Sequence, residues 1–236
     1  MSYEIKDGAV FIADVHINEN RQEFIEFLEF IKKNKPPQLF LVGDIFDLLI
    51  GKISYTEKFN KRYIDILNKL SENMEIFYFE GNHDFFLSSV FPNIKIFPLK
   101  EQPVKFSYKE KNIFLSHGDI ATPFFYQLYT AVIRDKIFLN IVSKIDRFLN
   151  DQISKKVILS QKDKFLCKNI ENFYDIVKMR LKKLNLKGID IIIEGHFHQG
   201  KEFEVLNKKY INLPSFACNK SFFIVQSQIG FKKIKL

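Results

Sequence analysis

Five short apolar runs in this chain end in a glycine, a carboxylate or a histidine, and this recurring ending constrains the fold more than any other feature. The clearest run is Leu39 to Val42, which is followed by Gly43 and Asp44. Four unbroken apolar residues are typical of a parallel strand covered on both faces, and glycine permits a sharp turn where the strand ends. Because ligands of open α/β sheets bind at the carboxyl ends of such strands, we predict an α/β fold with a site at one edge.

All five histidines of the chain fall in these strand-end segments. The other four segments follow apolar runs at residues 11–13, 77–79, 113–115 and 191–193. A single histidine is usually structural, but five that gather at strand ends indicate a shared function. The side chains in these segments that are suited to binding a metal are Asp14, His16, Asp44, Asn82, His117, His196 and His198.

The chemistry of these side chains favours a first-row metal ion. Imidazole, carboxylate and amide oxygen without thiolate suit Mn, Fe or Zn in a reactive site rather than a structural zinc. Residues i and i+2 of a strand point to the same side, so Asp14 with His16, and His196 with His198, are each predicted to converge on one point. Seven ligands are too many for one such ion. Two ions about 3.5–4 Å apart, bridged by Asp44, use them all and suit in-line displacement at phosphorus.

Five motifs, in this order, resemble those of the calcineurin-like metallophosphoesterases. They are Asp14-x-His16, Gly43 to Asp47, Gly81 to Asp84, His117 to Asp119 and Gly195 to His198, and they span most of the chain. The resemblance implies a four-layer αββα sandwich and two divalent metal ions, with Mn²⁺ expected and Zn, Fe or Mg as alternatives. It implies one ion on Asp14, His16, Asp44 and His198, and the other on Asp44, Asn82, His117 and His196. It also implies that His83 faces the phosphate without binding metal and is oriented by Asp47.

The expected substrate class depends on where this sequence differs from other members of that superfamily and on a segment inserted into it. Ser/Thr protein phosphatases carry Arg directly after Gly-Asp-x-x-Asp, and Leu48 at this position disfavours that activity. The chain length, a helical insertion after Asp119, and Tyr126 within it resemble the UDP-2,3-diacylglucosamine diphosphatases of lipid A synthesis. That resemblance implies cleavage to UMP and lipid X with acyl chains under the cap; some branches carry Arg at the position of His83. The expected substrate contacts are Asn82, Tyr126, Lys162 and Lys164.

Two other functions remain open at this point. A phosphodiesterase or phosphatase acting on a nucleotide or nucleic acid would also use a basic, aromatic surface. A non-catalytic scaffold of the same fold is disfavoured, because such scaffolds usually lose metal ligands or the phosphate-facing histidine, and none is missing.

The chain of 236 residues predicts a single domain over 1–236 with a helical cap inserted at about 121–165. Strands are predicted near 9–13, 38–42 and 75–79, alternating with helices near 21–33 and 55–71. Further strands are predicted near 94–97, 103–108, 112–116, 202–206, 209–212, 221–226 and 228–235. Two packed sheets flanked by helices accommodate all of them.

Positive charge is concentrated around the predicted cap, where residues 122–164 carry a continuous helical apolar pattern. Residues 120–185 contain 13 Lys or Arg against 6 Asp or Glu, which accounts for +7 of the net charge of +8. Such an insertion fits a membrane surface, an anionic lipid, a nucleic-acid backbone or a solvated helix face. We expect an anionic glycolipid nucleotide as substrate and the inner-membrane surface as partner, without nucleic acid or an obligate protein partner.

The chain termini and the cysteines set expectations about location. Residues 1–10 lack a signal-peptide pattern, and no stretch approaches the roughly 20 apolar residues of a membrane span. We therefore expect a cytoplasmic protein that associates peripherally with the inner membrane. The chain has two cysteines, Cys167 and Cys218, which lie far from the histidines in sequence. We therefore expect both to be reduced and buried.

Overall fold

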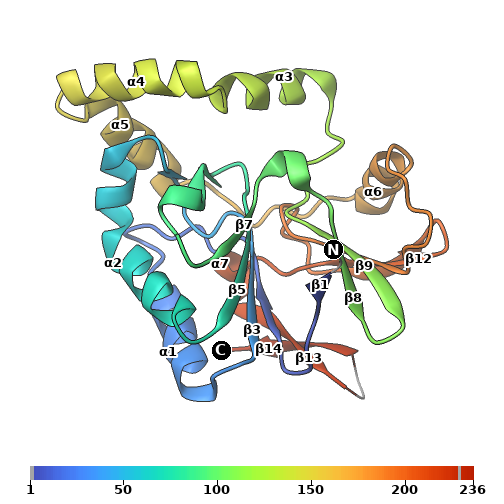
Figure 1. The fold of residues 1–236 in the computed structure, drawn as a ribbon. Helices are drawn as coiled ribbons and strands as arrows, with labels where there is room; N and C mark the ends of the chain where they lie inside the picture. The colour runs from blue at the N-terminus through green and yellow to red at the C-terminus, as the bar shows by residue number, and fades with distance from the viewer. Residues whose placement is uncertain (1–2, 228–229) are drawn as a thin grey trace.

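The computed structural model describes residues 3–227 and 230–236, apart from the side chains of Phe124 and Tyr126. Two six-stranded sheets form its centre, in the orders β14-β13-β2-β3-β5-β7 and β1-β8-β9-β10-β12-β11 (Figure 1). The strands of the first sheet are β2 (Val10–Ile12), β3 (Gln38–Val42), β5 (Glu75–Phe79), β7 (Lys95–Phe97), β13 (Ser221–Gln226) and β14 (Gly230–Lys235). Those of the second are β1 (Tyr3–Glu4), β8 (Val104–Tyr108), β9 (Lys111–Ser116), β10 (Ile191–Glu194), β11 (Glu202–Val205) and β12 (Lys208–Asn212).

Parallel pairing brings the functional strand ends together. Strands β2, β3, β5 and β7 are parallel neighbours in the first sheet, and β9, β10 and β12 are parallel neighbours in the second. The apolar run of β3 is fully buried, as expected for a strand covered on both faces. Because parallel strands share one carboxyl edge, the segments that follow β2, β3 and β5 leave the first sheet on the same side.

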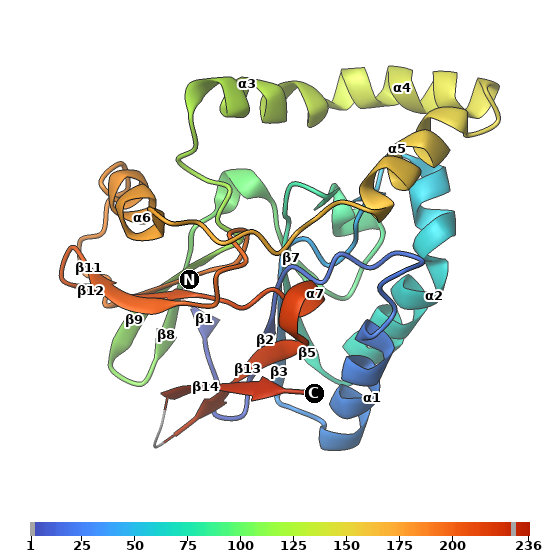
Figure 2. The same cartoon turned by 180° about the vertical axis from the view of Figure 1, so that it is seen from behind.

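Three apolar clusters separate four layers, and the predicted αββα sandwich is confirmed. Helices α1 (Phe24–Asn34) and α2 (Ser54–Ser71) cover the outer face of the first sheet. Stacked phenylalanines fill the space between the sheets, for example Phe11 on Phe40 with ring centroids 4.1 Å apart. Helix α6 (Phe173–Leu181) covers the second sheet. Figure 2 shows α1 and α2 on one side of the molecule and α6 on the other.

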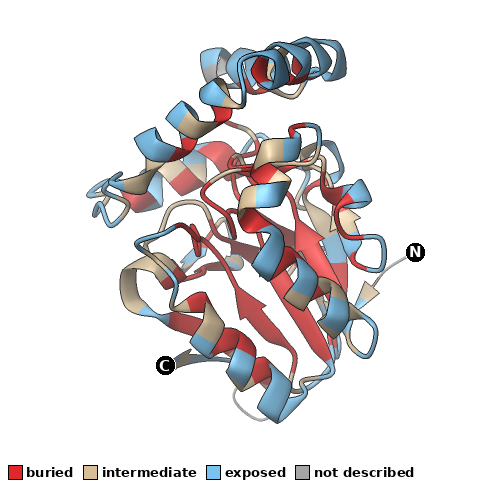
Figure 3. Ribbon diagram, turned by 90° about the vertical axis from the view of Figure 1, so that its left-hand side faces the viewer, coloured by how far each residue is buried: buried red, intermediate tan, exposed pale blue. Residues whose placement is uncertain are grey.

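Three helices occupy the interval predicted as the cap: α3 (Phe124–Ile133), α4 (Lys136–Phe148) and α5 (Gln152–Lys162). The continuous helix pattern of 122–164 is therefore interrupted twice, and Asp135 caps α4 by accepting the main-chain N–H of Phe138 at 2.7 Å. Helices α3 and α4 extend across one end of both sheets (Figures 1 and 2). They are largely exposed, in contrast to the buried sheets (Figure 3). Within the described part of the chain, no helix is both long and apolar enough to span a membrane.

Most predicted elements are present within a few residues of their expected ends, and β3, β5 and β13 have the predicted bounds. The sequence analysis missed β1 and a small pair formed by β4 (Leu49–Ile50) and β6 (Asp84–Phe85). It also missed α6, although the buried residues Phe173, Val177 and Leu181 recur at helical spacing. Short α7 (Phe216–Asn219) and two 3₁₀ turns at 87–89 and 99–101 were missed as well.

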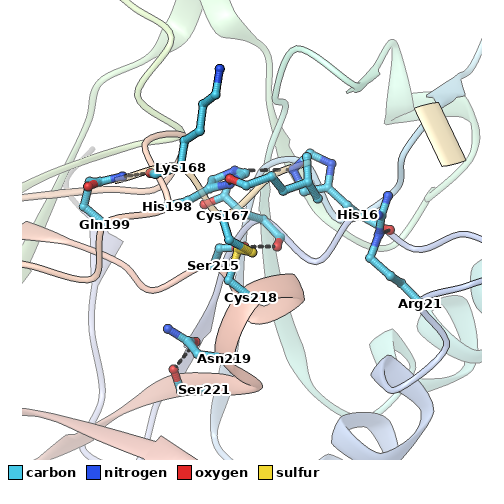
Figure 4. The surroundings of a disulfide bond; sticks show 12 residues. His16, Arg21, Cys167, Lys168, His198, Gln199, Ser215, Cys218, Asn219 and Ser221 are labelled. Carbon is cyan, nitrogen blue, oxygen red and sulfur yellow. Dashed lines mark hydrogen bonds and ion pairs between the residues drawn. A yellow bond between two sulfur atoms is a disulfide. The ribbon is translucent and has the colours of Figure 1, made fainter. Parts of the chain in front are cut away.

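Cys167 and Cys218 form a disulfide, so the prediction of two reduced, buried cysteines is wrong (Figure 4). Cys167 is exposed and Cys218 is partly exposed. The two residues are separated by 51 positions, but their Cα atoms lie 5.6 Å apart. Folding places the segment between α5 and α6 against α7, a contact between distant segments that cysteine count and spacing do not reveal.

Candidate metal centre

Five of the seven predicted ligands have left-handed backbone conformations. Their φ angles are 52° for Asp14, 50° for His16, 51° for Asp44, 64° for His196 and 59° for His198. A non-glycine residue in this region costs of order 1–3 kcal/mol, and such residues cluster at functional sites. The chain therefore turns sharply beyond each strand, and these residues are not part of an extended strand.

The described residues form three groups of possible ligand atoms; one of them joins His16 to Asp47 and His83, and the other two, the first and second clusters, consist of predicted ligands alone. In the first cluster, His198 Nε2 lies 3.2 Å from Asp14 Oδ1 and 3.4 Å from His16 Nε2. The second cluster joins Asp44, His117 and His196. The prediction that His196 and His198 converge on one point is therefore wrong, because left-handed turns at both positions remove the alternation of a strand. Asp14 and His16 do meet, although by turns rather than by strand geometry.

Asp44 lies between the two clusters. Its Oδ2 atom is 3.9 Å from His16 Nε2 and 3.4 Å from His117 Nε2, and its Oδ1 atom accepts the main-chain N–H of His83 at 2.9 Å. Burial raises the pKa of this carboxyl group, but the nearby imidazoles of His117, His83 and His16 together bring it well below its usual value. An ionised carboxylate at this position is placed to bridge two cations.

The hydrogen bonds of the histidines, and the buried atoms that make none, show whether this centre is suited to metal ions. His117 and His198 each donate Nδ1–H to a main-chain carbonyl, that of Val42 at 3.0 Å and that of Leu166 at 2.9 Å. Because a carbonyl can only accept, Nε2 remains the free ligand atom, as in most metal-binding histidines. Buried Asn82 Oδ1 has no hydrogen-bond partner, and buried His117 Nε2 faces Asp44 Oδ2 at 3.4 Å without a hydrogen bond. Burial, followed by the charge of His117, lowers the pKa of His196 to about 3, which keeps that ring neutral. The donor set fits two divalent ions.

His83 and Asp47 meet, but through the main chain of Asp47. His83 Nδ1 donates to the Asp47 carbonyl at 2.7 Å. The Asp47 carboxylate instead lies 3.2 Å from His16 Nδ1, pairs with Arg21 at 2.5 Å and accepts from Asn18. Asp47 therefore orients His83 through its backbone and His16 through its side chain, whereas Asn18 and Arg21 are supporting residues that the sequence analysis missed.

Asp84 connects two ligand-bearing loops. Its carboxylate accepts the main-chain N–H groups of Asp44 at 3.0 Å, Ile45 at 2.6 Å and Gly81 at 3.0 Å, and the Tyr78 hydroxyl at 2.6 Å. Burial and the charge of Asp44 raise the pKa of Asp84 to about 7. The Gly-Asn-His-Asp motif included Asp84, but its partners are main-chain groups that carry no sequence signal.

Two arginines, one in α6 and one just after α3, bind the main chain of other ligand-bearing loops. Arg180 of α6 is buried, pairs with Glu194 at 3.0 Å and donates to the Gly118 carbonyl at 2.5 Å, which joins the ends of β9 and β10. Arg134, which follows α3, donates to the Gly81 carbonyl at 2.6 Å and thereby ties the cap to the loop that carries Asn82. Neither arginine was predicted.

The predicted substrate contacts are only partly visible. Asn82 is in the centre with a free Oδ1 atom, whereas the side chain of Tyr126 lies outside the described residues. Lys162 Nζ pairs with Glu19 at 2.8 Å, and Lys164 is exposed. The roles of these residues remain predictions.

A cavity of about 1040 Å³ lies between α3 and the body of the protein. Asp119 lines it, and both buried carboxylate oxygens of Asp119 have no hydrogen-bond partner. Glu80 and Asp119 are each two residues along the chain from a predicted ligand, although none of the seven predicted ligands lines the cavity. The apolar lining includes Phe85, Phe86, Leu99, Ile120 and Leu184, and the cationic lining includes Lys52, Lys100, Arg134, Lys136 and Lys183.

Comparisons with known proteins agree with this geometry. The model of the calcineurin-like phosphoesterase family matches residues 9–200. A UDP-2,3-diacylglucosamine hydrolase of Wigglesworthia glossinidia brevipalpis is 26% identical over 211 residues, covering 86% of this chain and 84% of that protein. The corresponding hydrolase of Histophilus somni (strain 2336) is 27% identical over 199 residues, covering 80% and 83%. The structure of an archaeal phosphodiesterase aligns over 97% of this chain and 99% of its own, with a TM-score of 0.50 and 13% identity, a likeness of fold alone.

Proposed function

Because this chain belongs to the calcineurin-like phosphoesterase family, whose members are metal-dependent hydrolases of phosphoesters, we propose that it cleaves the pyrophosphate of UDP-2,3-diacylglucosamine. The products would be UMP and lipid X, as in lipid A synthesis. Similarity to hydrolases named for this substrate supports the proposal. The observation that carries it is the large cavity between α3 and the body of the protein, because it offers apolar walls for acyl chains and cations for phosphate groups.

Different residues of this chain would bind the metal ions and contact the phosphate. Asp14, His16 and His198 would hold one ion and His117, His196 and Asn82 the other, with Asp44 between them; we propose Mn²⁺, with Zn, Fe or Mg as alternatives. Such a pair of ions, when bound, activates a water nucleophile and stabilises charge on phosphoryl oxygens. His83, fixed by the Asp47 carbonyl, keeps Nε2 for the phosphate.

The decisive assay incubates metal-loaded protein with UDP-2,3-diacylglucosamine and identifies the products by ³¹P NMR and mass spectrometry. We expect UMP and lipid X in equal amounts. The basic surroundings of the cap favour the main alternative, a phosphodiesterase acting on nucleotides. Faster cleavage of a dinucleotide, with the glycolipid left intact, would establish that alternative instead.

A substitution that fills the cavity should impair cleavage of a lipid substrate but not of a small one. Ala131 of α3 lines the cavity, and Ala131→Trp places an indole in it. We expect KM for the glycolipid to rise about tenfold, because excluding two methylene groups from an apolar site costs about 1.6 kcal/mol. Turnover of bis-p-nitrophenyl phosphate should stay unchanged, since this substrate has no acyl chain.

The matched control is Ser160→Trp, which adds the same side chain at an exposed position of α5 outside the cavity lining. It should leave both substrates unaffected. Equal losses on the two substrates in Ala131→Trp would mean that the cavity does not take the acyl chains.

We also propose that α4 docks on an anionic membrane. The exposed residues Ile137, Ile141, Ile145 and Phe148 recur every three or four positions and form one stripe. Lys136, Lys144 and Arg147 are exposed and lie on the adjacent stripe. The opposite side of the helix is buried at Leu139, Ser143 and Asp146. Helix α4 therefore packs on the protein through one side and exposes an apolar stripe and a basic stripe on the other. Such a helix is suited to the interface of an anionic bilayer.

Two variants measure the apolar and electrostatic parts of this binding. Replacing the four apolar residues of the stripe by Ser should weaken binding to phosphatidylglycerol liposomes at every salt concentration. Replacing Lys136, Lys144 and Arg147 by Ser should weaken binding mainly at low salt, because each charge contributes about 1 kcal/mol that salt screens. Sedimentation with liposomes is the measurement, and a parent protein that stays in the supernatant would end the proposal.

A further inference from the structure

The disulfide lies next to one half of the metal centre. Cys167 belongs to residues 164–170, which have no regular secondary structure and connect α5 to α6. The preceding residue, Leu166, supplies the carbonyl that accepts Nδ1–H of His198 at 2.9 Å. Figure 4 shows the disulfide together with His198 and His16 of the first ligand cluster. The orientation of the His198 ring therefore depends on where this segment lies.

The other cysteine is on an element that holds Asp14. Cys218 lies in α7, where Ala217 donates its main-chain N–H to the Asp14 carbonyl at 3.1 Å. The hydroxyl of Ser215, just before α7, donates to the same carbonyl at 2.9 Å. The disulfide thus connects the segment that orients His198 to the helix that holds Asp14, and the Asp14 and His198 side chains lie 3.2 Å apart.

The second ligand cluster is connected to the disulfide less directly, since the main-chain N–H of His196 donates to the Asp14 carboxylate at 3.0 Å. His117 donates Nδ1–H to Val42 at the end of buried β3, and its main-chain N–H is held by the side chain of buried Gln102 at 2.7 Å. The 164–170 segment, by contrast, is mostly exposed, and its described hydrogen bonds to the body at this point come mainly from Gln199, which contacts Lys168 and Ile170 at 2.8 and 3.0 Å. His117 is therefore oriented by the core, whereas His198 is oriented by a cross-linked surface segment.

We propose that the Cys167–Cys218 disulfide is a positioning cross-link for the Asp14–His16–His198 half of the metal centre, and that its reduction selectively weakens metal binding there. Exposed Cys167 is open to a reductant. A thiol pair can supply the two electrons and two protons, so that the S–S bond of the protein breaks, two cysteine thiols form and the reductant becomes a disulfide. The Leu166 carbonyl is then no longer tied to α7, and His198 loses a fixed partner. Losing such a partner of a metal-binding histidine typically lowers affinity 10–100-fold.

The test titrates metal-free protein with Mn²⁺ and follows free Mn²⁺ by electron paramagnetic resonance. His117→Ala leaves the first cluster as the main site, and His16→Ala leaves the second while keeping the Asp14 carboxylate that accepts the main-chain N–H of His196. We expect reduction with tris(2-carboxyethyl)phosphine, which takes oxygen from water as it converts the disulfide to two thiols, to weaken Mn²⁺ binding about tenfold or more in His117→Ala. In His16→Ala it should change binding less than about twofold.

The double variant Cys167→Ser/Cys218→Ser supplies a second route and a control. It should reproduce the weakened binding in the His117→Ala background, and the phosphine should have no further effect on it. Equal responses in both backgrounds, no response in either, or two free thiols after treatment with diamide as oxidant would each overturn the proposal. The readout is metal binding, so a failure here is distinct from a failure to cleave the glycolipid.

Discussion

We expect Asp44→Ala to remove both metal ions and to lower turnover at least about a thousandfold. The Asp44 carboxylate lies within 3.4 Å of one cluster and 3.9 Å of the other, and it is ionised and buried. Without it, two cations would face each other with no anion between them. A metal pair at a phosphoryl group stabilises the transition state by several kcal/mol, and each 1.4 kcal/mol is about tenfold in rate.

Two further variants distinguish loss of the bridging charge between the ions from loss of the folded structure of the site. Asp44→Asn keeps an oxygen for the N–H of His83 but removes the charge, so it should lose metal nearly as completely as Asp44→Ala. Asp14→Ala should empty mainly the first cluster. Elemental analysis gives the metal content and circular dichroism checks folding; two metals retained per folded chain in Asp44→Ala would refute the bridging role.

His83→Ala and His83→Arg should differ according to the leaving group. His83 is buried beside His16, with ring centroids 5.0 Å apart, and its Nδ1 atom is committed to Asp47. A general acid contributes typically 10²–10⁴-fold when an alkoxide leaves. A sugar phosphate leaves more easily, because its second pKa is only about 6, and it needs charge stabilisation more than a proton.

We therefore expect His83→Ala to impair both kinds of reaction and His83→Arg to spare the pyrophosphate. The assay compares the wild type and both variants on UDP-2,3-diacylglucosamine and on the methyl ester of UMP, whose leaving group is an alkoxide. His83→Arg should retain much of the first activity and lose the second. Metal content is measured in parallel, so that ligand loss is not mistaken for lost acid catalysis. Equal damage by Arg and Ala on the pyrophosphate would argue against charge stabilisation.

Local patterns determined much of the fold. The bounds of β3, β5 and β13 follow from short apolar runs and their flanking polar residues, because burial of a strand is written into its own residues. Amphipathic spacing likewise located α1 and α2. The ligand residues were identified in the same way, since each stands within four residues of the carboxyl end of a strand, and parallel strands place their ends together.

The strand pattern alone predicted the wrong grouping of His196 with His198. The family resemblance, by contrast, implied the grouping of His198 with Asp14 and of His196 with His117 that the structure has. His196 and His198 are two residues apart, but left-handed turns send them to different clusters. The groups that orient the ligands are often main-chain atoms, such as the carbonyls of Val42 and Leu166, and a carbonyl has no signature in a sequence.

The amino-acid sequence by itself thus determined the layers of the fold and the chemical identity of the centre, because both depend on residue type and local period. Tertiary structure alone decided that left-handed turns assemble the clusters, that Arg134 and Arg180 hold the ligand loops, and that Cys167 meets Cys218. These contacts join segments far apart in the chain. Their geometry arises from the packing of whole layers, which no single stretch of residues specifies.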